Sequence, residues 1–138
     1  MSLKEEDRRI MVTLELDRVE KTIEEFELLA ENGMWSLAGN RLYYTLFHAV
    51  SALLINDNHE VGTHRGAVNR FSLYYVKTGI FTAAEGRMYS LLQKLREDGE
   101  YNCYIDIEKE DVEGFVEPTR QLIEKIKRYI NDKRINDY

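Results

Sequence analysis

Apolar residues recur at helical spacing from one end of the chain to the other. In the first segment they follow at alternating intervals of four and three positions, the stripe of an amphipathic helix, formed by Val12, Leu16, Val19, Ile23, Phe26 and Ala30. Charged residues fill the other positions, and Asn32 with Gly33 favours a helix end. The pattern predicts a long surface helix at the start of the chain.

The second segment, from about residue 34 to 55, is apolar on nearly every helical face. One stripe consists of Trp35, Ala38, Leu42, Leu46, Ala49 and Leu53. Further aliphatic and aromatic residues occupy the other faces. A helix of this kind is typically buried on all sides, so the pattern predicts a central helix around which the others pack.

Three more helices are expected after a polar loop at 56–62. Thr63 is a suitable N-cap for the third helix, and Thr82 with Glu85 fits the capping box of the fourth. Pro118 lies inside the last helix, where its missing N–H favours a kink. The expected ranges are about 63–76, 82–98 and 109–130.

Composition agrees with a single helical domain. The chain has 138 residues, and only 8 glycines and 1 proline interrupt it. There is no strand-like alternation, internal repeat or low-complexity tract. We therefore expect an all-α fold, an antiparallel up-and-down bundle of about five helices. It forms one domain over residues 1–138, with its core at about 10–130.

The net charge of −6 disfavours broad, non-specific binding to a nucleic-acid backbone. That charge is unevenly distributed, however. Residues 1–33 carry −5, residues 34–98 carry +2 and residues 99–138 carry −3. Every arginine and histidine considered below lies in the positive centre, which leaves a small local site for an anionic ligand open.

The chain lacks the features of secreted, membrane and metal-binding proteins. The single Cys103 excludes an internal disulfide framework. No apolar run approaches the roughly 18–20 residues that span a bilayer, and the N-terminus is too charged for a signal peptide, so we expect a soluble cytoplasmic protein without membrane association. His59, Glu60 and His64 are too few for a typical zinc site, and no phosphate loop occurs; neither metal nor cofactor is expected.

The second helix carries polar residues on one of its faces. Arg41 and His48 are seven positions apart and point within roughly 20° of each other, with Tyr44 between them. In a structural interpretation, Arg41 pairs with a carboxylate and His48 is a satisfied core histidine. In a functional one, Arg41 binds an anionic oxygen and His48 transfers a proton.

A second group of candidate residues ends the fourth helix. Arg96 is followed by Tyr101 and Tyr104, whose rings offer stacking surfaces and whose hydroxyls offer hydrogen bonds. An arginine with neighbouring aromatic rings suits an exposed base and its phosphate. Alternatively, Arg96 only stabilises the helix end through the helix dipole.

These residues together resemble the HEPN superfamily, and most closely its small stand-alone bacterial and archaeal members. The likeness covers roughly residues 10–130 and rests on 40–49 (NRLYYTLFHA), Thr63-His64, Phe71, 76–79 (VKTG), Leu95-Arg96 and Glu100-Tyr101. The resemblance implies an all-α bundle that is usually a homodimer. It also implies a possible nucleotidyltransferase partner, because many members form toxin–antitoxin pairs with such enzymes.

Catalytic members of this superfamily are metal-independent endoribonucleases with an Arg-x(4–6)-His motif late in the bundle. Here the matching arginine is Arg96, but no histidine follows it, and Tyr101 stands where a four-residue gap would place one. A tyrosine with an unperturbed pKa of about 10 is a poor general base at neutral pH. For cleavage, His48 or His64 would have to reach Arg96 in three dimensions.

Three hypotheses follow for function. The first is a dimeric RNA- or nucleotide-binding module with weak or no ribonuclease activity. The second is an endoribonuclease that yields a 2′,3′-cyclic phosphate, and the third is an antitoxin-type partner of a nucleotidyltransferase. The candidate catalytic residues are Arg96 and His48, and the candidate ligand-binding residues are Arg41, Tyr44, His64, Tyr101 and Tyr104.

Overall fold

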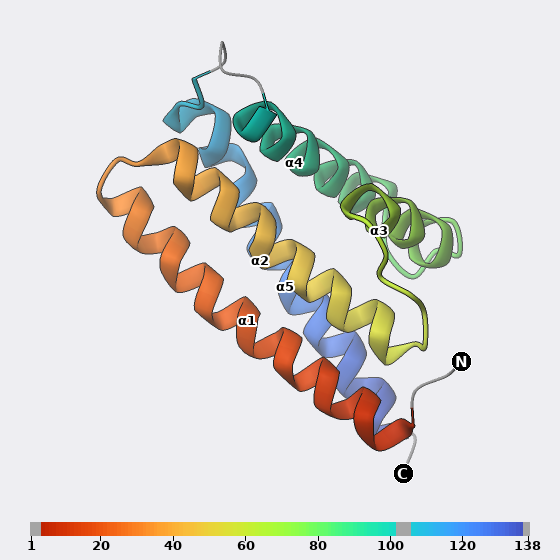
Figure 1. Cartoon of the computed structure of the whole chain (residues 1–138). Helices are drawn as coiled ribbons and strands as arrows, with labels where there is room; N and C mark the ends of the chain where they lie inside the picture. The colour runs from red at the N-terminus through yellow and green to blue at the C-terminus, as the bar shows by residue number, and fades with distance from the viewer. Residues whose placement is uncertain (1–3, 102–105, 137–138) are drawn as a thin grey trace.

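The computed structural model describes residues 4–101 and 106–136, and within them every regular element is a helix. The elements are α1 (Glu5–Glu31), α2 (Trp35–Asn56), α3 (His64–Phe71), the π-helix η1 (Ser72–Val76), α4 (Ala83–Tyr101) and α5 (Lys109–Asn136). Figure 1 shows α1 and α2 as an antiparallel hairpin, with α5 on one side of α2 and with α3 and α4 on another. The predicted all-α bundle is confirmed.

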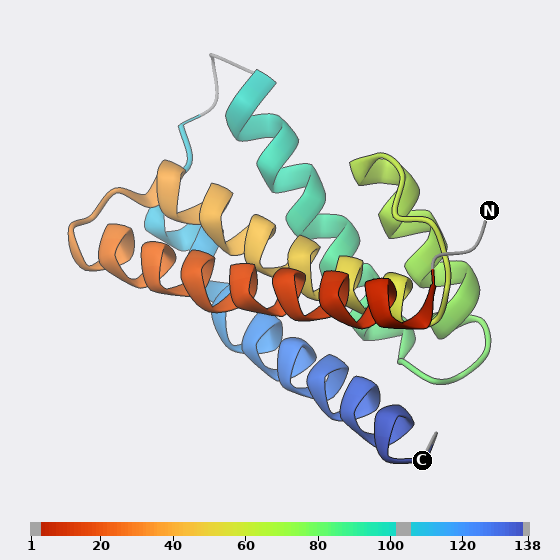
Figure 2. The same cartoon turned by 60° about the horizontal axis from the view of Figure 1, so that its bottom comes forward.

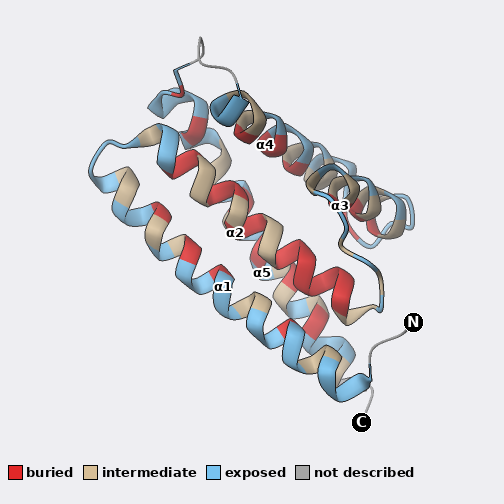
Figure 3. Ribbon diagram, in the orientation of Figure 1, coloured by how far each residue is buried: buried red, intermediate tan, exposed pale blue. Residues whose placement is uncertain are grey.

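Helix α2 is the centre of the bundle, as its sequence predicts. It packs against α1, α3, α4 and α5, and buried residues occur along its whole length (Figure 3). Its fully buried side chains include Leu42, Tyr43, Leu46 and Leu53. Helix α1, by contrast, buries one stripe against α2 and exposes the rest of its surface.

Local signals in the sequence set most helix boundaries correctly. Gly33 has φ +71°, a left-handed conformation that reverses the chain between α1 and α2. The Thr63 hydroxyl accepts a hydrogen bond from Gly66 N at the start of α3. The capping box forms at α4, where Thr82 N donates to Glu85 Oε1 and Glu85 N donates to Thr82 Oγ1.

Three helix ends differ from the sequence prediction: those of α3, α4 and α5, the last of which continues past residue 130 to Asn136. The third helix changes to π-helical hydrogen bonding at Ser72–Val76, in the turn that buries Tyr75 and brings its hydroxyl to Asp57 Oδ2 at 2.8 Å. Helix α4 continues past Gly99 to Tyr101, because a glycine weakens a helix without ending it. Helix α5 runs on through Pro118, and the kink expected there stays a prediction.

The start of α2, the end of α4 and the start of α5 lie together at one end of the bundle (Figures 1 and 2). Residues far apart in the sequence therefore meet there. Asn40 of α2 donates a hydrogen bond to Glu100 of α4, 60 positions away. This contact stabilises the last turn of α4, together with the ion pair between Glu100 and Arg96.

Candidate functional site between α2, α3 and α4

Arg96 is the centre of the candidate site. It lies in the last turns of α4, and only 7% of its side chain is exposed. Its Nη2 atom is 3.1 Å from a carboxylate oxygen of Glu100. Its guanidinium carbon lies 5.3, 5.7 and 5.8 Å from the ring centres of Tyr43, Tyr44 and Tyr101. The cation is thus held by one carboxylate and three aromatic rings, all within cation–π distance.

The hydrogen bonding of Arg96 is incomplete. Within the described part of the chain its buried Nε atom has no partner, and the contact from Nη2 to the Tyr101 hydroxyl is long at 3.5 Å. A buried guanidinium N–H without an acceptor is unfavourable by about 1–3 kcal/mol. This donor is available to an acceptor that enters the site after a small rearrangement.

His64 is brought to the same tyrosines by α3. It is the first residue of that helix, directly after the Thr63 cap, and its Nδ1 is 2.7 Å from the Tyr43 hydroxyl oxygen. Its ring also packs against Phe47 and Tyr44, with centroid distances of 4.5 and 5.6 Å. Partial burial lowers the pKa of His64, and the positive charge of Arg96 lowers it further.

Tyr43 is a member of this cluster that the sequence analysis does not include among the candidate residues. It is fully buried, and burial raises the pKa of its hydroxyl well above its ordinary value. The hydroxyl is therefore neutral and can donate a hydrogen bond to Nδ1 of neutral His64. A buried hydroxyl on the core face of α2 needs such a partner, and that requirement was the signal available in the sequence.

Arg41 lies at the edge of the cluster. Its guanidinium donates two hydrogen bonds to Asn40 Oδ1, at 2.8 and 3.2 Å, and lies 5.0 Å from the centre of the Tyr44 ring. The carboxylate of Glu25 on α1 is 3.9 Å away, at the limit of an ion pair. About a third of the Arg41 side chain is exposed, so its guanidinium is accessible to a ligand.

His48 is oriented differently from His64. Its Nδ1 lies 2.8 Å from Glu15 Oε2 on α1, and both side chains are largely buried. This geometry favours the structural interpretation for His48. The structure therefore brings Arg41, Tyr44, His64, Arg96 and Tyr101 together. The His48 ring also contacts Tyr44 and Phe47, at centroid distances of 6.4 and 5.7 Å, while its Nδ1 is bonded to Glu15 on α1. Tyr104 and Cys103 lie outside the described residues.

Within residues 4–101 and 106–136, no group of three or more His, Cys, Asp or Glu side chains is arranged to hold a metal ion. His59 and His64 contact different residues. The His59 ring stacks on Tyr74 at a centroid distance of 3.9 Å, whereas His64 bonds to Tyr43. None of the described helices is long and apolar enough to cross a membrane.

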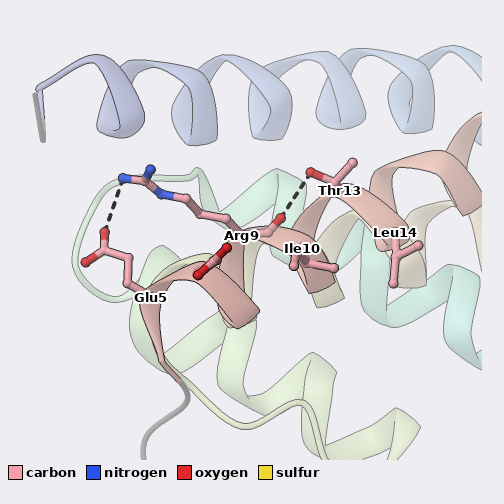
Figure 4. A pocket seen from close by; sticks show the side chains of 6 residues that line it. Glu5, Arg9, Ile10, Thr13 and Leu14 are labelled. Carbon is pink, nitrogen blue, oxygen red and sulfur yellow. Dashed lines mark hydrogen bonds and ion pairs between the residues drawn. The ribbon is translucent and has the colours of Figure 1, made fainter.

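A hollow of about 800 Å³ lies along α1, away from the cluster around Arg96 (Figure 4). It is open and shallow, and its lining comes from α1 alone, with Ile10 and Leu14 beside the Arg9–Glu5 ion pair. None of the candidate residues lines it.

Comparison with known proteins adds the family context. The HEPN domain profile matches residues 14–129. A "UPF0332 protein" of Thermotoga maritima is 33% identical over 118 residues, which cover 80% of this chain and 89% of the relative. Two Methanocaldococcus jannaschii proteins named "Putative toxin MJ0142" and "Putative toxin MJ0605" are 27% and 26% identical. Those two alignments cover 87% and 95% of this chain, and 82% and 97% of the relatives.

Proposed function

The chain belongs to the HEPN family, and from that premise we propose that it is an RNA- or nucleotide-binding module. The binding site is the cluster of Arg96, Arg41 and His64 with the rings of Tyr44 and Tyr101. The arginines bind phosphate oxygens, and an exposed tyrosine ring stacks on a base. Cleavage of RNA at this site is weak or absent in this proposal.

The observation that carries the proposal is the convergence of Arg96 with three tyrosines and His64 from three separate helices. The Tyr101 ring is 74% exposed, so it is accessible to a base. Nearby carboxylates such as Glu97 and Glu100 repel a phosphate backbone. They favour a short local contact over extended binding along a strand.

Binding of a single-stranded RNA oligonucleotide, followed by fluorescence anisotropy, tests this function. Replacing Tyr101 by Ala removes the stacking surface and is expected to weaken binding by about 1–3 kcal/mol. Tyr101→Phe keeps the ring and serves as the matched control, with affinity close to that of the unmodified chain. If Tyr101→Ala and Arg41→Ala both bind RNA normally, the proposed site is wrong.

A second candidate function is metal-independent endoribonuclease activity, as expected of a toxin. Two observations favour it: His64 and Arg96 contact the same two tyrosines, and two relatives carry toxin names. In that reaction His64 takes the proton of the 2′-OH and the 2′ oxygen attacks the phosphate. The bond from phosphorus to the 5′ oxygen breaks as the His64 imidazolium returns that proton to the leaving 5′ oxygen. Arg96 stabilises the charge that develops on the phosphate.

Incubation of RNA with the protein in EDTA separates this candidate from simple binding. A nuclease gives ends with a 2′,3′-cyclic phosphate, and the activity disappears in His64→Ala and Arg96→Ala but persists in His48→Ala. Intact RNA at high protein concentration removes this candidate and leaves the binding proposal in place.

Homodimer formation and a nucleotidyltransferase partner complete the proposed toxin–antitoxin context. They rest on the family likeness and on the toxin names of the two relatives. Light scattering at tens of micromolar tests the dimer, and a monomer mass would contradict it. Co-purification with the product of a neighbouring gene tests the partner, and recovery of this chain alone would count against it.

A further inference from the structure

A small cavity lies where α2 begins and α4 ends, beside Arg96. Its volume is about 100 Å³, roughly the space of three water molecules. The polar side chains in its lining belong mainly to Asn40, Arg96 and Glu100, and apolar ones to Leu37, Leu95 and Ile107. Apolar walls exclude water and strengthen the interaction of the Arg96 cation with any anion that enters.

Two independent features make this end of the bundle favourable for an anion. The Arg96 side chain is more than nine-tenths buried, and its Nε has no partner among the described residues. The N-terminus of α2 has no side-chain cap and no acidic residue in its first turn. Its partial positive charge is therefore not offset by residues of α2 itself.

The carboxylate of Glu100 is the anionic group that contacts the donors of this cavity. One of its carboxylate oxygens lies 3.1 Å from Arg96 Nη2, and the other accepts a hydrogen bond from Asn40 Nδ2 at 2.5 Å. About 30% of the Glu100 side chain is exposed, so it can move into solvent. Asn40 and Arg96 then offer the donors that it releases.

We propose that this cavity is a subsite for a terminal phosphate group, and that Glu100 competes with that phosphate for Arg96. The inference rests on the proposed binding function and specifies its ligand as a nucleotide or RNA strand with a free phosphate end. The volume is well below the about 300–1,000 Å³ of pockets that enclose whole drug-sized ligands. It admits a phosphoryl group, while ribose and base lie outside against the exposed Tyr101 ring.

An internal phosphodiester does not suit this cavity, because the strand would have to enter and leave through the same small space. The site therefore distinguishes a strand that begins with a 5′-phosphate from one that begins with a 5′-hydroxyl. Free mononucleotides share the phosphate monoester chemistry and are the other source of such a ligand.

Calorimetric titration of the full chain with 5′-AMP and with adenosine tests the subsite. A 5′-phosphorylated and a 5′-hydroxyl oligonucleotide of one sequence, together with inorganic phosphate, complete the set of probes. We expect 5′-AMP to bind at least tenfold more tightly than adenosine and the phosphorylated oligonucleotide more tightly than its 5′-hydroxyl form. Glu100→Gln removes the competing charge and should tighten binding of 5′-AMP about three- to tenfold. The matched control Glu24→Gln, an exposed position on α1, should leave it unchanged.

The outcomes separate the subsite from the broader function. Equal binding of the two oligonucleotides overturns the subsite and leaves RNA binding intact, as does weaker binding of 5′-AMP in Glu100→Gln. Absence of binding for every nucleotide and oligonucleotide overturns both. Tight binding of inorganic phosphate alone shows an anion site that does not read nucleotides, which contradicts the proposal. Thermal unfolding of Glu100→Gln establishes that the variant is folded.

Discussion

Buried polar groups between α2 and α1 have hydrogen-bond partners, whereas several buried polar atoms of α4 have none among the described residues. Towards α1, the Thr45 hydroxyl bonds to the Thr22 hydroxyl at 2.9 Å and to the Arg41 carbonyl at 2.8 Å. His48 bonds to Glu15 on the same side. On α4, the described residues include buried atoms without partners: Tyr89 Oη, Gln93 Oε1 and Arg96 Nε.

This difference agrees with the proposed division between polar groups that stabilise the fold and Arg96, the proposed ligand-binding cation. Buried polar atoms in a folded protein are nearly always paired, and the exceptions need an explanation. The α1 side follows the rule, so its threonines and His48 are accounted for by stability. The α4 side departs from it around Arg96, which is the cation expected to meet a ligand.

Replacement of Arg96 by Met gives the largest expected effect. Methionine has a similar length and no charge, so ligand binding should fall by about 1.5–3 kcal/mol, the usual contribution of hydrogen bonds to a charged group. The free energy of unfolding should fall by less than about 2 kcal/mol, because removal of the unpartnered buried N–H offsets part of the lost ion pair with Glu100 and of the lost ring contacts. Calorimetric titration and urea denaturation measure the two effects. A stability loss above about 2 kcal/mol would show that Arg96 is structural.

Thr45→Val tests the contacts between α2 and α1, and it should lower stability while leaving ligand binding unchanged. The substitution removes the hydroxyl that bonds to Thr22 and to the Arg41 carbonyl, and stability should fall by about 1–2 kcal/mol. Ligand affinity should stay within twofold. The Thr22→Val variant and the double variant complete a mutant cycle, in which additive losses would contradict a direct Thr22–Thr45 interaction.

Much of the fold was predictable from the sequence because the signals are local. The Thr63 cap, the Thr82–Glu85 box and the buried stripes of α2 each depend on residues within a turn or two of one another. Arg96 and Tyr101 are only five positions apart, so their proximity was also evident. Local patterns of this kind survive whatever tertiary packing follows.

The rest of the site depends on packing between distant segments. The Tyr43–His64 and Asn40–Glu100 contacts join residues 21 and 60 positions apart. His48 shares a helical face with Arg41, and this shared face makes it the catalytic candidate in the sequence, ahead of His64. The role of His48 depends on which helix packs against that face of α2. That helix is α1, and its Glu15 bonds to His48. No periodicity within α2 contains that information.

His48→Gln should have a smaller effect that is confined to stability. The substitution weakens the contact between His48 and Glu15 while keeping a polar side chain of similar reach. The expected loss in the free energy of unfolding is about 0.5–1 kcal/mol, with binding unchanged. Urea denaturation and RNA titration measure both quantities. A loss of binding comparable to that of Arg96→Met would mean that His48 takes part in ligand binding.

His64 should give the smallest effect, a dependence of stability on pH. Partial burial and the Arg96 charge lower the pKa of His64 in the folded chain, whereas the unfolded chain titrates near pH 6.5. Between the folded pKa and about 6.5 the unfolded chain therefore binds more protons, so stability falls as the pH falls through this window. Above about pH 6.5, the contribution of His64 to the free energy of unfolding is constant.

Urea denaturation of the unmodified chain and of His64→Gln at several pH values between 5 and 8 isolates this contribution. The stability difference, unmodified chain minus variant, should rise with pH below about 6.5 and then level off. His48→Gln serves as the control variant: it keeps His64, so its own stability should retain the rise with pH that His64 causes. A flat difference would mean that folding leaves the pKa of His64 unchanged. A difference that grows as the pH falls would mean that His64 gains a negative partner on folding, and the neutral Tyr43–His64 pair between α2 and α3 would then be wrong.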